Sequence, residues 1–440
     1  MTTEQQTFEE LDEEGTQFEL QDVTQHIVDS EHKSAPESEE GYPYIKTSDI
    51  ENGRINFDDV SYVNKEAYQE WTRRLTPQPG DIIFTREAPV GRVGLIPEGK
   101  EVCLGQRTVL IRPDPEKLDN QYLRYLLLSK DIQNRFNSLS TGSTVDHLNL
   151  GDLRSFELPN LPDLQEQKII GQMLSNFDEK IETNKSILEL LEDISQSIFE
   201  NRFVDYEPYD RFKQTELGEI PEDFEIVEVD DLIWSGRGYS YTSDYLDKEN
   251  EIEDSYPMIN LKNVKEGGGF QTDGYKYYTE ESIKDRYHIE KGDLVVAITE
   301  QTLDGSLIGS PSLIPRIEAE KSIISQDLAK IVPDEISKVF FYHLFNSSRF
   351  DEYTTSVATG TTVYHLSLTS IGEFKFALPP MEDINNFVDL VEDFHEMKYN
   401  IIDKISRLED LRDTLLPKLV SGEVRVNDIN LEDIEVGSEV

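Results

Sequence analysis

Two stretches of the chain, residues 163–203 and 381–420, carry apolar residues spaced alternately four and three positions apart. This spacing is typical of a helix that packs along a second helix. The first stripe consists of Ile170, Leu174, Phe177, Ile181, Asn184, Leu188, Leu191 and Ile198. The second consists of Phe387, Val391, Phe394, Ile401, Ile405, Leu408 and Leu415. Because the same kind of helix occurs twice, we expect the two to pair with each other as an antiparallel coiled coil.

One member of the first stripe, Asn184, is polar, and its counterpart in the second stripe is Ile401. A buried asparagine would weaken the pairing somewhat and fix its register. The alternative is that Asn184 lies exposed at the edge of the stripe.

The segments between these helices repeat one another in the same order. Gly80-Asp81-Ile82-Ile83 matches Gly292-Asp293-Leu294-Val295, and the segment 141–148 matches 359–366. An order that never scrambles indicates a tandem duplication.

Each copy contains short β-branched and aromatic runs bounded by Gly, Pro and Asp, which predict strands of a mixed or antiparallel sheet. The predicted strands are Asp81–Thr85, Arg92–Ile96, Thr108–Ile111, Leu294–Ile298 and Leu328–Val332. One helix per copy is predicted, over Asn120–Phe136 and Glu335–Tyr353. The fold class is therefore α+β, with two tandem globules.

The predicted organisation gives each globule its own long helix and relates the two halves by a pseudo-two-fold axis. The predicted parts are an acidic tail (1–17), a first globule (18–160), a long helix (161–204), a linker (205–223), a second globule (224–380), a second long helix (381–421) and an acidic tail (422–440). Antiparallel pairing of the helices would place the globules at opposite ends.

The charge of the chain changes the range of plausible partners. It has 89 Asp and Glu against 42 Lys and Arg, a net charge of −47. Such acidity normally argues against nucleic acid as a partner, because phosphate contacts need positive charge. Acidity spread through the whole chain also fits adaptation to a cytoplasm of very high salt, where repulsion between carboxylates is screened. On that interpretation net charge does not exclude DNA.

The single cysteine, Cys103, excludes a disulfide framework and a cysteine-based zinc site. The N-terminal residues have no signal-peptide pattern, and no apolar run is long enough to span a membrane. A cytoplasmic protein is expected.

In the order of its motifs, the chain resembles the specificity subunit of type I restriction–modification enzymes over nearly its full length. The resemblance is carried by Leu217-Gly-Glu-Ile-Pro-Glu-Asp-Phe224, Gly91-Arg92-Val93-Gly94, Leu158–Pro162 and residues 415–426. The first copy lacks the Leu-Gly-Glu-Ile-Pro segment, and Phe224 stands where the family usually has tryptophan.

This resemblance implies two target-recognition domains, each reading one half of an asymmetric, two-part DNA site, with the helices setting the gap. It also implies docking of two methyltransferase subunits, which methylate adenine, and of a restriction and translocase subunit. S-adenosylmethionine, Mg and ATP are then expected only in those partners.

The chain itself shows no catalytic constellation. Gly91-x-Val-Gly94 lacks the Gly-Lys-Ser/Thr of a phosphate-binding loop, and there is no methyltransferase motif. The acidic pairs at 58–59 and 230–231 are more consistent with solvated surface. The equivalent His147 and His365 have no further ligands at metal-binding spacing, and we expect each to pack where globule meets helix. No enzyme activity, cofactor or metal is therefore expected.

Base readout and phosphate contact require Arg, Lys, Asn, Gln and hydroxyl side chains on loops. The basic-aromatic loop 237–241 is the best of these candidates. For each single base-reading candidate the alternative is an ordinary surface charge or ion pair, and for the hydroxyl segments 141–144 and 359–362 it is a structural turn. The candidates are Lys46, Thr47, Arg73, Arg74, Arg86, Arg92, Arg107, Ser143, Thr144, Arg237, Tyr239, Tyr241, Lys262, Asn263, Lys265, Lys276, Gln301, Thr361 and Thr362.

Three other functions stay open on the sequence. The same architecture could serve a system whose methylase and nuclease form one polypeptide, which neighbouring genes would reveal. A hydrolase using paired carboxylates would show activity without partner subunits. A protein-binding scaffold would protect no DNA in molar salt.

Overall fold

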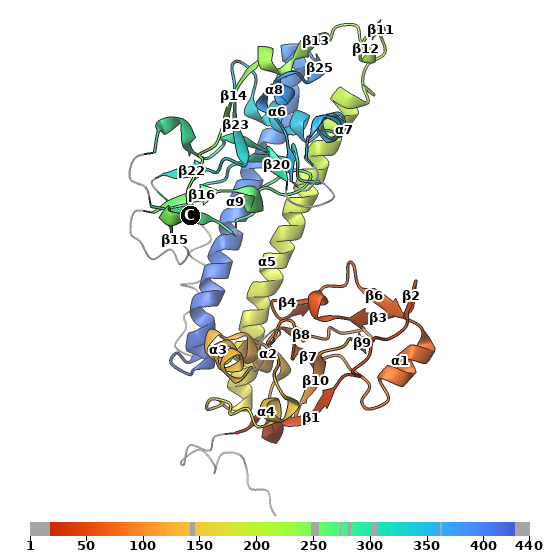
Figure 1. Ribbon diagram of the computed structural model, residues 1–440, viewed down its shortest axis with the longest axis vertical. Coiled ribbons are helices and arrows are strands. Elements are labelled where there is room, and N and C mark those ends of the chain that lie inside the picture. The colour runs from red at the N-terminus through yellow and green to blue at the C-terminus, as the bar shows by residue number, and fades with distance from the viewer. Residues whose placement is uncertain are drawn as a thin grey trace, which may run out of the picture. The chain divides into compact units, whose positions relative to one another are not determined.

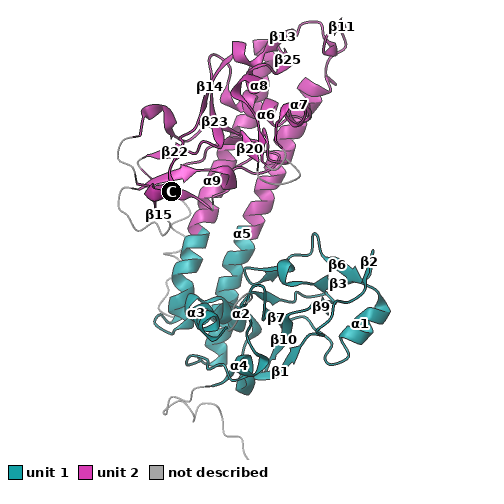
Figure 2. Ribbon diagram, in the orientation of Figure 1, with its two compact units in different colours: residues 1–181, 408–440 teal, residues 182–407 magenta. Residues whose placement is uncertain are grey.

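The chain forms two compact units in a computed structural model. Residues 18–140, 146–247, 255–272, 274–279, 283–300, 306–317, 319, 321–360 and 363–426 are described. Unit 1 comprises residues 1–181 and 408–440, and unit 2 comprises residues 182–407 (Figure 2).

Unit 1 contains a four-stranded antiparallel sheet of order β1-β10-β7-β8 (Figure 1). All four residues of β7 are buried. A strand with neighbours on both sides and both faces covered needs a continuous apolar run, and β7 supplies Ile-Ile-Phe-Thr. The strands are β1 (Thr24–Asp29), β7 (Ile82–Thr85), β8 (Val93–Leu95) and β10 (Thr108–Pro113).

The second sheet of unit 1 has the order β2-β6-β3-β9, with β3 and β9 parallel. Its strands are β2 (Glu37–Ser38), β3 (Tyr42–Ile45), β6 (Ser61–Val63) and β9 (Cys103–Leu104), and β4 (Ile50–Glu51) pairs with β5 (Arg54–Ile55) beside it.

Unit 2 repeats both strand orders, with one additional strand, β18, at the edge of its second sheet. Its first sheet, β14-β23-β19-β21, is antiparallel throughout, and its second, β15-β17-β16-β22-β18, again contains one parallel pair, β16 with β22. The strands of the first sheet are β14 (Ile233–Arg237), β19 (Leu294–Ala297), β21 (Pro311–Leu313) and β23 (Leu328–Pro333). Those of the second are β15 (Leu246–Asp247), β16 (Tyr256–Ile259), β17 (Lys276–Tyr278), β18 (His288–Ile289) and β22 (Ser322–Ile324).

Three further two-stranded sheets lie in unit 2. They pair β11 (Phe212–Thr215) with β12 (Gly218–Pro221), β13 (Glu225–Glu228) with β25 (Lys375–Leu378), and β20 (Thr299–Glu300) with β24 (Tyr364–His365). The β11-β12 hairpin occupies much of the segment 205–223, which the sequence analysis had treated as a linker.

Backbone hydrogen bonds recur at the positions that match in sequence. The Gly80 amide donates to the Ile96 carbonyl at 2.9 Å, and the Gly292 amide to the Ile314 carbonyl at 2.8 Å. The segments 146–148 and 364–366 are held alike, because Leu148 donates to the Arg86 carbonyl and Leu366 to the Ile298 carbonyl. The five predicted strands are confirmed as β7, β8, β10, β19 and β23, with ends shifted by one or two residues.

The aspartate after each of these glycines is a buried anchor. Asp81 accepts from the backbone of Gln78 and, at 2.7 Å, from two nitrogens of Arg112. Asp293 accepts from Lys330 at 2.6 Å and Lys338 at 2.7 Å. Burial alone would raise the pKa of Asp293, but the hydrogen bonds from the two lysines outweigh it and lower that pKa.

The single helix predicted within each globule is wrong in both copies, because each is two helices. In unit 1, α2 (Asn120–Leu128) ends where Ser129 adopts an extended conformation, and α3 (Lys130–Leu139) follows. In unit 2, α6 (Lys338–Phe345) gives way to α7 (Ser348–Val357), whose N-cap Ser347 accepts from the Phe350 amide. Serine competes for backbone hydrogen bonds in this way and so favours helix ends over helix interiors. The other short helices are α1 (Lys65–Trp71), α4 (Leu150–Arg154) and α8 (Leu368–Gly372).

Helices α2 and α6 cover the first sheet of their unit (Figure 1). Helix α2 packs against β8 and β10, and α6 packs against β19, β21 and β23. Several of the largest fully buried side chains, including Tyr122, Tyr125, Phe340 and Phe341, belong to α2 and α6. The main core of each unit therefore lies between its sheet and these helices.

The two long helices are confirmed as α5 (Leu164–Phe199), which continues as one π-helical turn over Glu200–Val204, and α9 (Met381–Val420). At a rise of about 1.5 Å per residue each is roughly 55–60 Å long. Each helix contributes residues to both units. In unit 1 the beginning of α5 (Ile170, Leu174, Phe177) shares a core with the end of α9 (Leu415, Leu419). In unit 2 the end of α5 packs against the beginning of α9, and the rings of Phe199 and Phe387 lie 5.4 Å apart, edge to face.

Candidate nucleic-acid interface

Most candidate cations of unit 1 form ion pairs. The Lys46 ammonium lies 2.7 Å from the Glu37 carboxylate, and the hydrogen bond from Lys46 lowers the pKa of Glu37. Lys46 also donates to the Ser61 hydroxyl. Its neighbour Thr47 donates its hydroxyl to the Ala88 carbonyl at 3.3 Å. Lys46 and Thr47 therefore lie together at the end of β3, with the lysine charge offset by a carboxylate.

Four arginines of unit 1 have different exposures. Arg73 and Arg74 are largely exposed and pair with one carboxylate, Glu31, at 3.1 and 3.5 Å. Arg86 is buried and pairs with Asp29 at 3.0 Å, so it acts inside the unit and does not present a base-reading group at the surface. Arg92 donates to the backbone carbonyls of Thr47 and Ile50, which ties the segment after β3 to β8.

Arg107 lies in the turn between β9 and β10 with a positive φ of 69°. A positive φ is uncommon for a non-glycine residue, and Arg107 adopts it here within a tight turn. The guanidinium is half exposed and lies 3.5 Å from Glu87.

Glu87 also receives His147, whose Nδ1 lies 2.6 Å away. In unit 2 the equivalent His365 pairs in backbone register with Thr299. The expectation that these histidines pack where globule meets helix is therefore wrong, because each lies against the segment that follows the buried strand β7 or β19.

The candidates of unit 2 gather on two segments beside the second sheet. Arg237 is exposed at the end of β14 and donates to the Gln326 carbonyl. Tyr239 and Tyr241 follow it, and Lys276 of β17 donates to the Tyr241 hydroxyl at 2.5 Å. The basic-aromatic loop 237–241 thus acquires a second cation, Lys276, from a distant part of the chain.

Three other candidates of unit 2 lie on a short turn after β16. Asn263 is fully buried, accepts from the Asn260 amide and donates to the Gln271 carbonyl, so it holds the turn and cannot reach a base. The side chain of Lys262 packs against Gly274, where a Cβ would lie 3.1 Å from the lysine Cβ. Lys265 contributes backbone hydrogen bonds with Gly268 and Gly269.

The remaining candidates lie outside the described residues: Ser143, Thr144, Gln301, Thr361 and Thr362.

A buried ionic node joins three helices of unit 1. The Asp178 carboxylate on α5 receives Arg412 of α9 at 3.0 Å, Arg124 of α2 at 3.1 Å and the Tyr125 hydroxyl of α2 at 2.5 Å. Asp178 and Arg124 are both more than nine-tenths buried. One carboxylate therefore ties a helix of the globule to both long helices.

Unit 2 has a node of the same kind, again centred on a carboxylate of α5. Glu192 accepts from Lys398 of α9 and from the Tyr342 hydroxyl of α6, both at 2.7 Å. Tyr125 lies four residues before Ser129, near the end of α2, and Tyr342 lies five residues before Ser347, near the end of α6.

Beside this second node lies a buried histidine pair. Nε2 of His343 (α6) and Nε2 of His395 (α9) are 3.0 Å apart, and Nδ1 of His343 is 2.9 Å from the Gln196 amide oxygen on α5. Burial lowers the pKa of His395 to about 2, with the Lys398 charge adding to the effect. Burial also holds the pKa of His343 well below its usual range, so both rings are neutral.

The sequence analysis missed these nodes because their members flank the apolar stripes. The sequence feature that could have predicted these nodes is a charged residue directly after a stripe residue, such as Asp178 after Phe177 and Glu192 after Leu191. In a protein with 89 acidic residues such neighbours do not stand out.

All predicted stripe residues are buried or half-buried. Asn184 is only 7% exposed, so the alternative that places it at an exposed edge is wrong.

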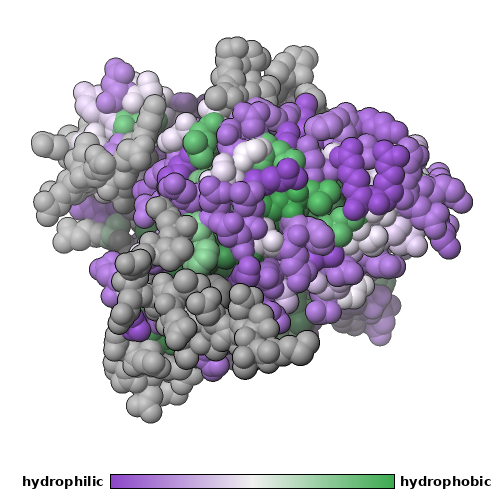
Figure 3. All heavy atoms as spheres, turned by 90° about the horizontal axis from the view of Figure 1, so that it is seen from below, coloured by the Kyte–Doolittle hydropathy of each residue, from purple (hydrophilic) through white to green (hydrophobic). Residues whose placement is uncertain are grey.

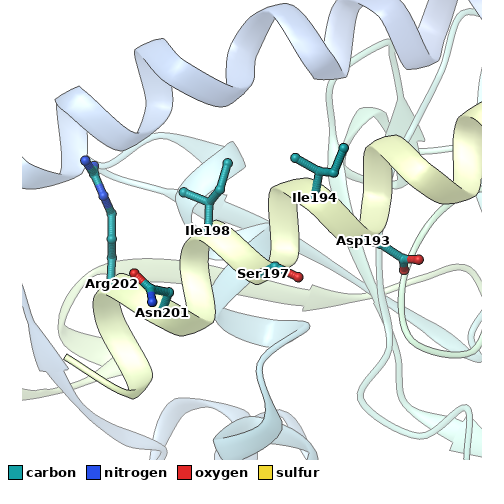
Figure 4. Close-up of a pocket in the computed structure, with 6 residues that line it drawn as sticks. All are labelled: Asp193, Ile194, Ser197, Ile198, Asn201 and Arg202. Atoms are coloured by element: carbon teal, nitrogen blue, oxygen red, sulfur yellow. The ribbon is translucent and has the colours of Figure 1, made fainter. Parts of the chain in front are cut away.

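The outer face of α5 in unit 2 carries a second, exposed apolar stripe. Ile187, Leu190 and Ile194 are 37%, 58% and 40% exposed, at helical spacing. Beyond them a shallow hollow is lined by Asp193, Ile194, Ser197, Ile198, Asn201 and Arg202 (Figure 4). Figure 3, a view from below, shows a face on which the coloured residues are mostly hydrophilic, with smaller hydrophobic areas between them.

Within the described ranges, no cluster of three or more His, Cys, Asp or Glu side chains could hold a metal ion. None of the described helices is long and apolar enough to cross a membrane.

Comparison with known proteins places the chain among proteins of one kind. It is 27% identical over 388 residues to the type I restriction enzyme MjaIX specificity subunit of Methanocaldococcus jannaschii, covering 83% of this chain and 82% of that one. It is also 27% identical over 433 residues to the putative MjaX specificity subunit of the same organism, covering 95% of each. The crystal structure of the type I restriction-modification S subunit from M. genitalium shares the fold, with a TM-score of 0.54 at 18% identity over 93% of this chain and 97% of that one.

Residues 13–193 and 221–408 match the family described as the type I restriction modification DNA specificity domain. These matched ranges cover most of the chain and include strands of both sheets in each unit. The chain belongs to this family of type I restriction–modification DNA specificity proteins.

Proposed function

We propose that this chain is the non-catalytic specificity subunit of a type I restriction–modification complex and reads an asymmetric DNA site in two parts. Unit 1 and unit 2 act as two target-recognition domains, one for each half-site. Methylation of adenine and cleavage belong to the methyltransferase and restriction subunits that dock on it.

The observation that carries this proposal is the repetition of one pair of sheets in two units of different surface chemistry. The order of the four strands in the first sheet is the same in both units, and the second sheets share the order of four strands. The candidate reading residues differ, with arginines near carboxylates in unit 1 and tyrosines with Lys276 in unit 2. A repeated scaffold with two different surfaces is what reading two different half-sites requires.

The spacer is the second part of the proposal. α5 and α9 pair as an antiparallel coiled coil and set the gap between the half-sites. Support comes from the contacts inside each unit. In unit 1 the beginning of α5 packs against the end of α9, and in unit 2 the end of α5 packs against the beginning of α9. The buried nodes at Asp178 and Glu192 fix the register of such a pair, because a shift by one residue would leave a buried carboxylate without its cation.

The docking of partner subunits is the third part. The exposed stripe of Ile187, Leu190 and Ile194 offers an apolar helix face to a helix of the methyltransferase subunit. A stripe of this spacing on a charged helix is the kind of anchor that a helical partner recognises.

The net charge of −47 adds a condition, since a DNA-binding protein of this charge requires screening. We propose a cytoplasm of high salt, where the Debye length is about 3 Å at 1 M and only close contacts count.

The test is co-expression with the partner methyltransferase in a host without other adenine methylation, followed by mapping of methylated adenines. We expect one two-part motif with a fixed gap of several base pairs. Insertion of one heptad at equivalent places in α5 and α9 should lengthen the gap and leave both half-motifs unchanged. Exchange of residues 18–160 for a homologous domain should change one half-motif only. Absence of any motif would overturn the proposed function.

A further inference from the structure

Unit 2 carries a cluster of tyrosines on its second sheet, the sheet of β15, β16 and β22 in Figure 1. The ring of Tyr278 on β17 is buried at the centre, and the rings of Tyr239, Tyr241 and Tyr245 lie 5.6, 6.3 and 5.8 Å from it, edge to face. Tyr287 extends the cluster through Tyr239, at 5.1 Å. Tyr245 is 48% exposed, so the cluster reaches the surface.

Two cations lie on the rim of this cluster. The Lys276 ammonium is 4.8 Å from the centroid of the Tyr241 ring and donates to its hydroxyl. The Arg286 guanidinium is 4.6 Å from the centroid of the Tyr287 ring and donates to that hydroxyl. A cation over an aromatic face is held by the negative face of the ring, and its charge is not cancelled there.

Neither cation forms an ion pair with a carboxylate in the part of the chain that the structure describes. The contrast with Lys291 of the same unit is direct. Lys291 lies 4.6 Å from the Tyr399 centroid, but its ammonium is also 3.1 Å from the Glu396 carboxylate. Holding a cation on a phenol ring in a chain of net charge −47 keeps its charge available to an outside anion.

The matching place in unit 1 is built differently. There β3 and β6 repeat the pairing of β16 and β17, so Ser61 occupies the place of Lys276. The Lys46 ammonium binds Ser61, and Glu37 offsets its charge. Both units thus bring a lysine nitrogen to this strand position and near a tyrosine ring, at 5.9 Å for Lys46 and Tyr44, but among the described residues only the lysine of unit 1 is also paired with a carboxylate.

We propose that Lys276 and Arg286 contact the DNA phosphates at the half-site read by unit 2, with Tyr241 and Tyr287 as the residues that position them. The inference rests on the proposed function and adds to it the residues that orient unit 2 on the duplex. Phosphate contacts fix register and orientation and carry no base information. Loss of these cations should therefore weaken binding without changing the half-motif.

The test uses the assembled complex and a duplex that carries the mapped motif. Dissociation constants are measured by fluorescence anisotropy over a range of KCl concentrations for the wild type, Lys276→Gln and Arg286→Gln. Each lost phosphate contact should flatten the slope of log K against log salt by about 0.9 and weaken binding about three- to tenfold. Tyr241→Phe, which keeps the ring and removes the hydroxyl that holds Lys276, should show a smaller loss than Lys276→Gln.

The matched control is Lys291→Gln, which removes an equal charge from over a tyrosine of the same unit, and it should leave affinity and slope unchanged. Thermal unfolding checks that each variant is folded. If the wild type binds its motif and both glutamine variants bind with unchanged slope, the inference is overturned and the proposed function stands. Loss of a protein subunit from the complex with an unchanged salt slope also overturns it, because the surface then contacts protein. If the wild-type complex recognises no motif, both fail together.

Discussion

Asp178 of α5 and Arg412 of α9 lie 234 positions apart in the chain and are joined by a hydrogen bond of 3.0 Å inside unit 1. Arg124 and Tyr125 of α2 complete the surroundings of this carboxylate. A buried carboxylate with two guanidinium partners is stable only while those partners remain, because an unpaired buried charge is expensive. The same logic applies to Glu192 in unit 2 and suggests where each unit is most sensitive to substitution.

The first prediction concerns Asp178→Ala. This change leaves Arg124 buried without its carboxylate, and we expect the free energy of unfolding of unit 1 to fall by about 3–5 kcal/mol. Chemical denaturation in molar KCl measures it. Glu189→Ala, at an exposed position of α5, is the control and should change stability by no more than about 0.5 kcal/mol. A loss below about 1 kcal/mol for Asp178→Ala would show that the node does not hold the three helices.

The second prediction concerns the coupling of Glu192 with Lys398. The two side chains are 18% and 10% exposed, so salt screens their interaction little. A double-mutant cycle with Glu192→Gln and Lys398→Met should give a coupling free energy of about 1–3 kcal/mol. The coupling should persist between low and molar salt. The exposed pair Lys33 with Glu70 serves for comparison, and its coupling should be small and vanish in high salt.

The third prediction is a pH dependence that arises from the histidine pair. Burial holds the pKa of His343 and His395 below the unfolded value of about 6.5, so the unfolded chain takes up protons that the native state does not. Stability from this source is complete above pH 6.5 and is lost as the pH falls toward the folded pKa, which is about 2 for His395. The loss is at most about 1.4 kcal/mol per pH unit for each histidine.

Unfolding free energies of the wild type and of the double variant His343→Leu with His395→Leu, measured from pH 7 to pH 5, test this. The double variant should show the shallower decline. His26→Gln, at an exposed position of β1, should leave the decline of the wild type unchanged. Equal slopes for the wild type and the double variant would contradict the assignment of the acid sensitivity to this pair.

The sequence predicts those parts of the fold that rest on local periodicity and on the repeat. The buried strands and long helices follow from runs such as Ile82–Phe84 and from stripes such as Ile170, Leu174 and Phe177, where hydrophobicity alone decides. The break between α2 and α3 at Ser129 was not predicted, because an apolar pattern continues across it and only the serine conformation ends the helix.

The candidate site was harder to predict because residue type does not reveal burial. Arg86 and Asn263 have the side chains of base readers, yet both are buried, with Arg86 paired to Asp29 and Asn263 hydrogen-bonded to the Gln271 carbonyl inside their unit. Arg286 and Tyr287 were not selected, because their proximity to Tyr239 depends on how distant strands pair. Only the sheet register brings residues 239, 278 and 287 together.

The last prediction concerns the exposed apolar stripe of α5. Leu190 is 58% exposed, so Leu190→Glu should change the stability of the isolated chain by no more than about 0.5 kcal/mol. If a helix of the methyltransferase subunit packs on this stripe, a buried glutamate would leave an unpaired charge in the interface and weaken assembly severely. Co-purification of the partner with Leu190→Glu measures the effect, and Leu139→Glu, a change at a comparably exposed leucine of α3, should leave assembly intact. Normal recovery of the methyltransferase subunit with Leu190→Glu would mean that the partner docks elsewhere, and the apolar stripe would then need another explanation.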